Sequence, residues 1–295
     1  MDETLFSLNG HIVPEEQAVV PVTDRGFLYG DGLFETIHAY GATPFRLSEH
    51  LARLEHGRKA LGFPSRPSRA VLARWLREAV QAARFPEANV RLTFTRGTGP
   101  RGPSLRGPYR PNVVITVTRH HRRPETDYTR GVTAILASFR RQESSIIANL
   151  KTTAYVEQII ARREADAARA DEALLLNNAG ALCEGSASNL SLVSRGVLRM
   201  PDPRIAGALP GTAQQLAVEL ARGLKIPVCR TALGLHDLRE CDEAFLSGSM
   251  RELTPLVRVN DWTIGGGRPG PITRGLITAY RKLVEDECAP YRFQP

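Results

Sequence analysis

Lysine is scarce in this chain of 295 residues. Lysine and arginine together number 39, but only four of these residues are lysines: Lys59, Lys151, Lys225 and Lys282. Arginine keeps its proton in a protein, whereas lysine can lose its proton and form a Schiff base. If the protein performs amine chemistry through a covalent bond, the search is therefore limited to four residues.

Long hydrophobic runs are also missing. No apolar run approaches the 18 residues that indicate a membrane-spanning helix, and runs such as residues 132–137 have the length of strands. The sequence opens with MDET, which is acidic and not typical of a signal peptide. We therefore expect a cytoplasmic protein with no membrane partner.

Cysteine is rare and is not grouped. The four cysteines show no CxxC spacing and have no histidine at a spacing typical of metal ligands. We therefore predict reduced thiols, with neither a disulfide framework nor a metal site. The cysteines are Cys183, Cys229, Cys241 and Cys288.

The net charge of +8 raises the possibility of a nucleic-acid partner. The arginines, however, are dispersed among acidic and apolar residues. The one dense basic cluster, residues 119–123, is short and ends at Pro124. A basic nucleic-acid-binding protein is therefore kept only as a remote alternative, and we expect no nucleic-acid partner.

Strand and helix patterns are mixed along the chain without a regular βαβ alternation. This favours two domains of the α+β or α/β class. The polar stretch from Arg119 to Asp127 is the best boundary. We predict a small N-terminal domain at 1–120, a linker at 121–128 and a larger domain at 129–295.

Several local patterns predict individual elements. Asn9-Gly10 between two apolar runs predicts a hairpin with a type I′ turn. Ser48 is the predicted N-cap of a first helix, and a second helix is predicted from about Ser68 to Ala83. The stretch from Gly97 to Pro111, rich in Gly, Pro and Arg, is expected to be a long loop that is mobile over a pocket.

Lys151 differs from the other three lysines in its surroundings. The others fit helix surfaces or a helix-to-strand turn, whereas Lys151 stands just before a helix predicted from about Thr153 to Arg169. Two small-residue turns follow downstream, Gly211-Thr212 and Gly248-Ser249. The first opens a predicted helix, where backbone N–H groups and the helix dipole favour a phosphate.

Seven stretches carry a family pattern, in order and over nearly the whole chain. They are DRGFLYGDGLFET (24–36), HLARL (50–54), KTTAY (151–155), DEALLLNNAGALCEGSASN (171–189), LPGTA (209–213), CDEAFLSGSMRELTP (241–255) and GRPGPITR (267–274). The set resembles the class IV aminotransferases, the fold-type IV pyridoxal-phosphate enzymes. That family includes branched-chain and D-amino-acid aminotransferases, (R)-selective amine transaminases and 4-amino-4-deoxychorismate lyases.

The resemblance implies a two-domain α/β (α+β) fold with pyridoxal 5′-phosphate between a small N-terminal and a larger C-terminal domain. Lys151 matches the lysine that holds this cofactor as an aldimine and then acts as the general base. Glu184 matches the carboxylate that keeps the pyridine nitrogen protonated, so that the cofactor can take up electrons. Arg53 matches the phosphate-binding arginine. Tyr155 matches a tyrosine near the phenolic oxygen of the cofactor.

The two turns match the remaining phosphate ligands of the family. Thr212 with Gly211, and Ser249 with Gly248, are expected to complete the phosphate site. The resemblance also implies residues that bind the substrate.

Tyr29, Phe34 and His38 match positions that line the pocket from the small domain, although His38 stands where branched-chain enzymes often have an arginine. Arg101 matches the substrate-carboxylate arginine of D-amino-acid aminotransferases, but Pro103 replaces their histidine. Arg251 is either a carboxylate ligand or a surface charge, and the sequence leaves both open.

The pattern EGSASN, the LTP segment and Glu35 favour transamination between an amino acid, either a branched-chain L- or a D-amino acid, and a 2-oxo acid. The main alternative is a 4-amino-4-deoxychorismate lyase that eliminates pyruvate to give 4-aminobenzoate. By resemblance we expect a homodimer or a higher homo-oligomer.

Overall fold

The computed structural model describes residues 4–293, which fall into two units. Within the described chain, unit 1 contains residues 4–121, 150–154 and 284–293, and unit 2 contains residues 122–149 and 155–283. The domain boundaries given above from the sequence stay a prediction. A short helix, α4 (Glu125–Thr129), begins inside the stretch predicted as a linker.

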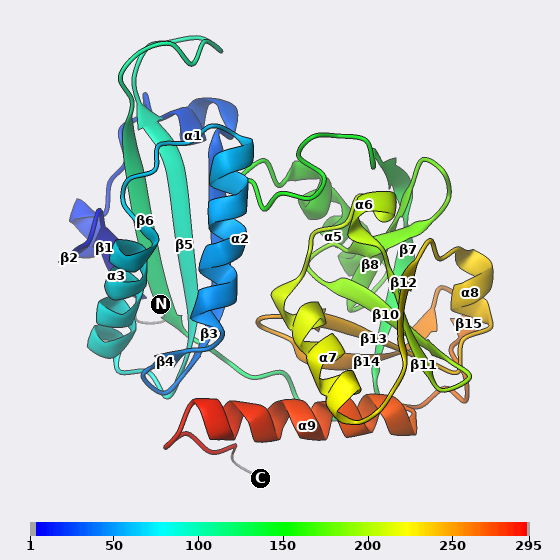
Figure 1. Cartoon of the computed structure of the whole chain (residues 1–295). Helices are drawn as coiled ribbons and strands as arrows, with labels where there is room; N and C mark the ends of the chain where they lie inside the picture. The colour runs from blue at the N-terminus through cyan, green and yellow to red at the C-terminus, as the bar shows by residue number, and fades with distance from the viewer. Residues whose placement is uncertain (1–3, 294–295) are drawn as a thin grey trace. The chain divides into compact units, whose positions relative to one another are not determined.

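Unit 1 is built on an antiparallel six-stranded sheet with the order β2-β1-β6-β5-β3-β4. Helices α2 and α3 cover one face of this sheet (Figure 1), and their leucines pack against alternate strand residues in a hydrophobic core. The strands are β1 (Thr4–Leu8), β2 (His11–Val13), β3 (Gly32–Tyr40), β4 (Thr43–Pro44), β5 (Glu87–Thr98) and β6 (Arg110–Arg119). The helices are η1 (Glu15–Gln17), α1 (Arg25–Tyr29), α2 (Leu47–Ala60) and α3 (Arg69–Ala83).

Local sequence signals explain the hairpin and the start of α3. Asn9 and Gly10 join β1 to β2 with φ angles of 52° and 89°, the left-handed pair that a type I′ turn needs. A Cβ atom on Gly10 would also lie 2.2 Å from the ring of Trp75. Ser68 is the N-cap of α3, because its hydroxyl accepts a hydrogen bond from the N–H of Val71. These predictions are confirmed.

The predicted cap of the first helix is wrong. Helix α2 begins at Leu47, and its N-cap is Arg46 in a left-handed conformation with φ 52°. The hydroxyl of Ser48 instead accepts a hydrogen bond of 2.7 Å from Nη2 of Arg69, on α3. The long loop is shorter than predicted, because β5 extends to Thr98 and β6 begins at Arg110.

Unit 2 is built on a nine-stranded mixed sheet. Its strands follow the order β12-β11-β10-β13-β14-β7-β8-β9, and β15 pairs with β14. Three pairs are parallel, namely β14 with β7, β7 with β8 and β11 with β12. The strands are β7 (Val132–Arg141), β8 (Glu172–Asn177), β9 (Leu182–Gly185), β10 (Asn189–Ser194), β11 (Val197–Pro201), β12 (Val228–Thr231), β13 (Glu243–Gly248), β14 (Glu252–Val259) and β15 (Trp262–Thr263).

A further pairing closes six of these strands into a ring. Strand β9 pairs with β8 on one side and with β10 on the other, where Glu184 is opposite Asn189. The strands β10, β13, β14, β7, β8 and β9 therefore form a barrel-like closure. Because Glu184 lies at the joint, its position is fixed from two sides.

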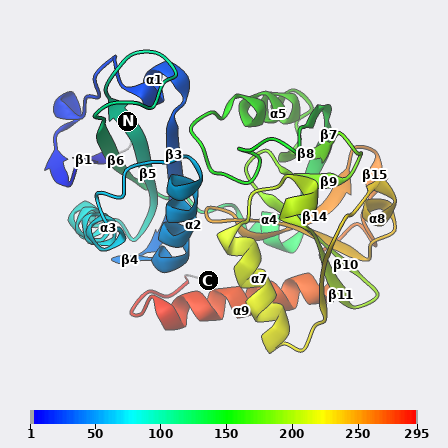
Figure 2. The same ribbon diagram turned by 45° about the horizontal axis from the view of Figure 1, so that its top comes forward.

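Small residues let α5 approach the sheet of unit 2. Ala161 and Ala165 of α5 are buried against Ala173 and Leu175 of β8, and the helix lies beside β7 and β8 (Figure 2). Besides α4, the helices of this region are α5 (Val156–Ala167), α6 (Pro203–Ala206), α7 (Thr212–Gly223), α8 (Leu235–Arg239) and α9 (Pro271–Glu287), of which residues 284–287 belong to unit 1. The mixed α/β class predicted from the sequence is confirmed.

The helix predicted to begin at Thr153 begins later, at Val156. Residues 150–154 instead run extended along β3, with an isolated bridge between Leu33 and Thr152. Among residues 4–293, no helix combines the length and the apolar character needed to span a membrane.

Candidate active site

Lys151 is fixed by the backbone of unit 1. The N–H of Phe34 donates to the carbonyl oxygen of Lys151 at 2.9 Å, and the N–H of Thr153 donates to that of Gly32 at 2.9 Å. A Cβ atom on Gly32 would lie 2.8 Å from Oγ1 of Thr153, so the close approach requires glycine. A short extended segment pinned on both sides of Lys151 therefore sets where its amine projects.

Successive side chains of β3 point to opposite faces of the sheet, so the neighbours Phe34 and Glu35 lie on different faces. Phe34 faces away from α2, and the Nζ atom of Lys151 lies 4.5 Å from the centroid of its ring. On the same face, the guanidinium carbon of Arg91 lies 3.9 Å from that centroid. Phe34 thus contacts two cations, of which Arg91 was not singled out from the sequence.

Glu35 faces α2 and binds Arg53, the predicted phosphate ligand. Nε and Nη2 of Arg53 donate to Oε1 and Oε2 of Glu35 at 2.9 and 2.6 Å. Nδ1 of His50, one helical turn before Arg53, lies 2.7 Å from Oε2 of the same carboxylate. This bidentate pair fixes the plane of the arginine, and Glu35 is a positioning residue that the motif pattern did not identify as part of the site.

Glu35 is fully buried yet ionised. Burial raises the pKa of this carboxyl, but the charge and the hydrogen bonds of Arg53, together with those of His50, outweigh burial and lower the pKa to about 2. The pKa of His50 lies below its usual range, because burial and the nearby cations Arg53 and Lys151 outweigh the attraction of Glu35. His50 is therefore neutral and donates its Nδ1 proton to the carboxylate.

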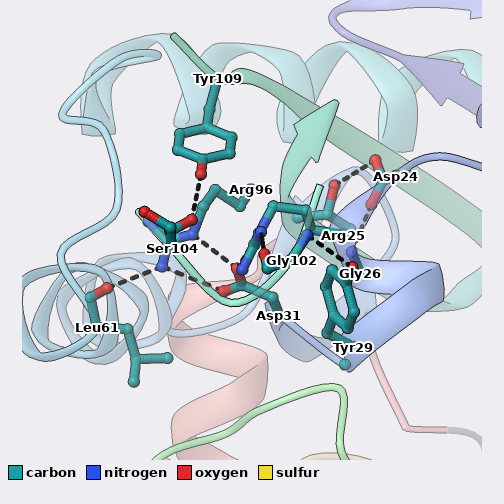
Figure 3. A network of polar contacts seen from close by, with 12 residues as sticks. Asp24, Arg25, Gly26, Tyr29, Asp31, Leu61, Arg96, Gly102, Ser104 and Tyr109 are labelled. Atoms are coloured by element: carbon teal, nitrogen blue, oxygen red, sulfur yellow. Dashed lines mark hydrogen bonds and ion pairs between the residues drawn. The ribbon is translucent and has the colours of Figure 1, made fainter. Parts of the chain in front are cut away.

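The loop that carries Arg101 is tied to α1 at the next residue (Figure 3). Nη1 of Arg25 donates to the carbonyl oxygen of Gly102 at 2.6 Å, and the N–H of Gly102 donates to the hydroxyl of Tyr29 at 3.1 Å. Gly102 has a φ angle of 87°, which favours glycine. Arg101 itself is exposed. Both backbone groups of its neighbour are therefore held by residues of α1.

Two acids of the DRGFLYGDG stretch hold α1 in place. Asp24 caps the helix by accepting from the N–H of Gly26, and it also accepts from Thr95 of β5 at 2.7 Å (Figure 3 shows Asp24 and Gly26). Asp31 binds both Arg25 and Arg96. Burial raises the pKa of Asp31, but the hydrogen bonds of Arg96 and Arg25 lower it below its ordinary value.

His38 lies further along β3 than Phe34 and is only 2% exposed. Its Nε2 atom lies 2.9 Å from Oε2 of Glu87. The pocket role that the resemblance implies for His38 stays a prediction.

In unit 2, Glu184 is 7% exposed and is oriented by three groups. Nη1 of Arg141 donates to Oε1 of Glu184. The N–H of Leu209 donates to Oε2 at 2.8 Å, and Nδ2 of Asn189 donates to the same oxygen at 3.3 Å. Asn189 also donates to the carbonyl oxygen of Leu209, at 2.8 Å. The carboxylate is therefore linked to the segment that opens α7.

That segment ends in the predicted phosphate turn. Gly211 is the N-cap of α7, and the helix begins at Thr212, in agreement with the sequence prediction. A Cβ atom on Gly211 would lie 1.8 Å from Oδ1 of Asn189, so this position requires glycine. Asn189 thus brings Glu184 and the N-terminus of α7 together within unit 2.

The second turn lies against the loop that follows Glu184. A Cβ atom on Gly248 would meet the carbonyl oxygen of Ala187 at 3.4 Å. Tyr155, at the N-cap of α5, donates from its hydroxyl to the carbonyl oxygen of Ser186 at 3.4 Å. Ser249 follows Gly248 directly, so unit 2 also brings Tyr155 and the second phosphate turn to one loop.

The buried carboxylate of Glu172 binds the loop at residues 186–188 through hydrogen bonds. Its Oε1 accepts from the N–H of Ser186 at 3.0 Å, and its Oε2 accepts from the hydroxyl of Ser188 at 2.7 Å. Arg251 binds Oε2 at 3.1 Å and is only 9% exposed. The alternative of a surface charge is therefore wrong for Arg251, whereas its role as a substrate ligand stays a prediction. Burial holds its pKa below the ordinary value despite Glu172.

Comparison with known proteins identifies the family of the chain. The family model for amino-transferase class IV matches residues 32–259. The chain belongs to the class IV aminotransferases. A Methanocaldococcus jannaschii protein assigned as a branched-chain-amino-acid aminotransferase is 32% identical over 277 residues, which cover 94% of this chain and 95% of that protein. A Listeria monocytogenes D-alanine aminotransferase is 30% identical over 290 residues, covering 97% and 98%.

Solved structures of this family share the whole fold. A branched-chain amino acid aminotransferase from T.th., solved with pyridoxamine 5′-phosphate, has a TM-score of 0.89 and 28% identity, and the match covers 97% of this chain and 95% of that one. The 4-amino-4-deoxychorismate lyase of Pseudomonas aeruginosa has a TM-score of 0.85 and 31% identity, covering 96% and 100%. The predicted family, fold type and aminotransferase class are confirmed.

Class IV aminotransferases are pyridoxal-phosphate enzymes, and the side chains present fit that cofactor. A phosphate needs cations and backbone N–H groups, and Arg53 and the N-terminus of α7 are groups of these two kinds. The pyridine nitrogen needs a carboxylate, and Glu184 is a buried one held in a fixed orientation. The aldehyde needs an amine, and Lys151 is the lysine that the backbone of β3 fixes.

Proposed function

We propose that this chain is a transaminase that exchanges an amino group between an amino acid and a 2-oxo acid, with pyridoxal 5′-phosphate as its cofactor. Arg53, the turn Gly211-Thr212 and the turn Gly248-Ser249 bind the phosphate. Glu184 binds the pyridine nitrogen, and Tyr155 serves the phenolic oxygen. Lys151 binds the aldehyde carbon. The observation that carries the proposal is the pair of backbone hydrogen bonds that pins the segment of Lys151 to β3.

When bound, pyridoxal phosphate supplies an electron sink that lets the α-proton of an amino acid leave. The side chains of this chain then do the rest. Once the substrate amine has displaced Lys151 from the aldehyde carbon, the freed Nζ would move the α-proton of the substrate as the general base. The Glu184 carboxylate holds the proton on the pyridine nitrogen, and Arg141, Asn189 and the N–H of Leu209 hold that carboxylate in place.

For the substrate we propose a branched-chain L-amino acid or a D-amino acid, with a 2-oxo acid as acceptor. The relatives assigned to both substrate classes support this range. Phe34, beside Lys151, supplies an apolar surface to the substrate side chain, and Arg91 lies over the same ring. Arg101 binds a substrate carboxylate, and Tyr29 and Arg25 hold its loop through Gly102.

Replacement of Lys151 tests the proposal most directly. The purified protein with its cofactor should be yellow, and borohydride should reduce the cofactor onto Lys151. Lys151→Ala should lose turnover by at least about 10³-fold while keeping its fold, because it lacks both the covalent anchor and the general base. Lys225→Ala, on an exposed turn, is the matched control. Normal turnover in Lys151→Ala would contradict the assignment.

The amino donor is tested by half-reactions without a 2-oxo acid. Conversion of the cofactor to its amine form by L-leucine, by D-alanine or by a simple amine would identify the class and the handedness of the donor. If none of these converts it, transamination is the wrong reaction for this chain.

A 4-amino-4-deoxychorismate lyase is the second candidate, supported by the Pseudomonas aeruginosa structure of similar length and fold. The EGSASN and LTP patterns favour the transaminase. Release of 4-aminobenzoate and pyruvate from 4-amino-4-deoxychorismate, together with failure of every half-reaction, would favour the lyase.

We also propose that the chain forms a homodimer or a higher homo-oligomer in the cytoplasm. Exposed apolar side chains on α1, namely Phe27 at 75% and Leu28 at 45%, support an interface on unit 1. The four cysteines are unpaired, as expected for a reducing compartment. Light scattering after size exclusion tests the proposal, and a monomer of 32.5 kDa at working concentration would contradict it.

A further inference from the structure

Three potential metal ligands of unit 1 meet at one end of the six-stranded sheet. His38 is on β3, Glu87 is the first residue of β5, and His120 directly follows β6. Glu87 is opposite Tyr40 of β3, and the N–H of His120 donates to the carbonyl oxygen of Glu87 at 2.9 Å. Because opposed residues share a face and residues two apart on a strand do too, the three side chains share one face.

The side chains are as close as this register implies. Nε2 of His38 lies 2.9 Å from Oε2 of Glu87, and the ring centroids of the two histidines are 4.4 Å apart. One nitrogen or oxygen from each residue lies within 4.8 Å of the other two. Three donor atoms on three neighbouring strands are therefore held together by the sheet.

One ring nitrogen of the buried His38 lacks a hydrogen-bond partner in the part of the chain that the structure describes. His38 is 2% exposed, and its Nδ1 atom is buried without a hydrogen-bond partner among residues 4–293. Burying such an atom without a partner costs about 1–3 kcal/mol. The ring packs on Tyr40 at a centroid distance of 3.8 Å, which makes the surroundings apolar on that side.

The carboxylate is oriented by the C-terminal segment of unit 1. The hydroxyl of Tyr291 donates to Oε1 of Glu87 at 2.7 Å, so the other oxygen, Oε2, is the one directed to His38. Phe293 packs against the rings of Tyr291 and Tyr40. Carboxylates that bind metals are themselves held by hydrogen bonds of this kind.

We propose that His38, Glu87 and His120 bind a divalent transition-metal ion, most suitably zinc, through one ring nitrogen of each histidine and Oε2 of Glu87. Two imidazoles and one carboxylate are a known zinc donor set, with the fourth position left to water. Magnesium and calcium prefer oxygen ligands and fit this set poorly. None of the three residues is a proposed cofactor ligand, so metal binding can be tested whether or not the proposed transaminase reaction is confirmed.

The ion ties three strand ends to the C-terminal segment. Donor atoms about 2.0–2.2 Å from zinc in a tetrahedron are roughly 3.4 Å apart, so His120, the more exposed of the two histidines, moves towards His38 and Glu87. Bound zinc then stabilises unit 1, because the folded chain binds it better than the unfolded one does. Its role is structural, and it needs no contact with substrate.

Metal binding by the untagged protein with its cofactor tests this proposal. After chelator treatment and dialysis, the protein is titrated with Zn²⁺ by calorimetry, and the bound metal is counted by elemental analysis. Co²⁺ replaces Zn²⁺ in a second titration, because its visible spectrum reports a tetrahedral site. We expect one ion per chain and a higher Tm with Zn²⁺ than with chelator.

Variants of two adjacent histidines make the test specific. His120→Gln removes a ligand at a position that is not deeply buried, so the fold should survive, and Zn²⁺ affinity should fall by at least about 10-fold. His121→Gln is the matched control, because His121 is exposed and is not part of the cluster. His120→Cys should keep zinc binding and add a thiolate-to-Co²⁺ absorption band.

Two results would overturn the proposal. One is a wild-type protein that binds no Zn²⁺ beyond what His120→Gln binds. The other is equal loss of binding in His120→Gln and His121→Gln, which would indicate a surface site elsewhere. Since both variants keep every proposed cofactor ligand, metal bound at the cofactor would be equal in the two and cannot imitate the expected difference.

Discussion

Glu35 of unit 1 and Glu184 of unit 2 are both buried carboxylates bound to an arginine, but their other partners differ in kind. Glu35 is bound by Arg53 through two nitrogens and by the neutral His50, and all three lie on β3 and α2. Glu184 is bound by one nitrogen of Arg141, by an amide side chain and by a backbone N–H.

Because their partners differ, we expect the two buried negative charges to have different roles. The charge of Glu35 fixes a neighbouring cation, so its main effect is on stability and on the position of Arg53. The charge of Glu184 is held by fewer cationic contacts and by neutral donors, which leaves it able to act on a bound group. Replacing each carboxylate by its amide should therefore produce different losses.

Of the two amide variants, Glu184→Gln should lose more activity. An amide carries no negative charge and cannot keep a proton on the pyridine nitrogen, so kcat should fall on the order of 10²–10³-fold. Single-turnover kinetics and the cofactor spectrum measure the effect. Glu219→Gln, on the exposed side of α7, is the control and should retain wild-type kcat. A kcat within threefold of wild type in Glu184→Gln would show that this carboxylate does not serve the reaction.

Glu35→Gln should instead reduce stability. The change leaves the largely buried Arg53 without its carboxylate, and breaking such a pair costs about 3 kcal/mol or more. Glu78→Gln on α3 is the control, because the side chains of Glu78 and its partner Arg74 are 52% and 65% exposed and their pair should contribute less than about 1 kcal/mol. Urea unfolding followed by a probe in unit 1 measures both. Equal losses in the two variants would remove the distinction drawn between Glu35 and Glu184.

The contribution of Glu35 to the free energy of unfolding should depend on pH. The pKa of Glu35 falls from 4.5 to about 2 on folding, so its stabilising effect is complete above pH 4.5 and is lost as pH falls through 2. A difference of this size corresponds to about 3 kcal/mol. The free energies of unfolding of wild type and Glu35→Gln should therefore converge between pH 5 and pH 2. A gap between them that does not change over this range would assign the stability loss to packing and not to charge.

Sequence patterns predict the site residues that belong to local motifs and miss those whose partners are distant in the sequence. Gly211, Gly248 and Glu184 each belong to a short contiguous sequence motif, so the motifs predict them. Arg141 is on β7 and Arg91 is on β5, and their partners Glu184 and Phe34 lie far from them in the sequence. No local pattern distinguishes them from the many other arginines of the chain.

The same contrast between local and distant interactions applies to the fold. The hairpin at Asn9 and Gly10 and the start of α7 depend on neighbouring residues and are confirmed. A helix was expected to begin at about Thr153, but residues 150–154 run extended along β3, which precedes them by more than 100 residues. The three members of the proposed metal site are likewise far apart in sequence and meet only through the register of β3, β5 and β6.

The smallest expected effect concerns the loop of Arg101. Tyr29→Phe removes the hydroxyl that accepts a hydrogen bond from the N–H of Gly102. Because such a bond contributes about 1 kcal/mol, KM for the substrate whose carboxylate Arg101 binds should rise by about fivefold at unchanged kcat. Tyr109→Phe removes a contact to Ser104 within the same loop and is the matched control.

A double-mutant cycle decides whether Tyr29 acts through the loop or on the substrate. If it positions Arg101, Tyr29→Phe should raise KM in the wild-type background and leave it unchanged in Arg101→Ala, because the two changes then remove the same interaction. If Tyr29 contacts the substrate itself, the two effects should instead add. Additive effects would therefore contradict the positioning role and would favour the pocket role implied by the family resemblance.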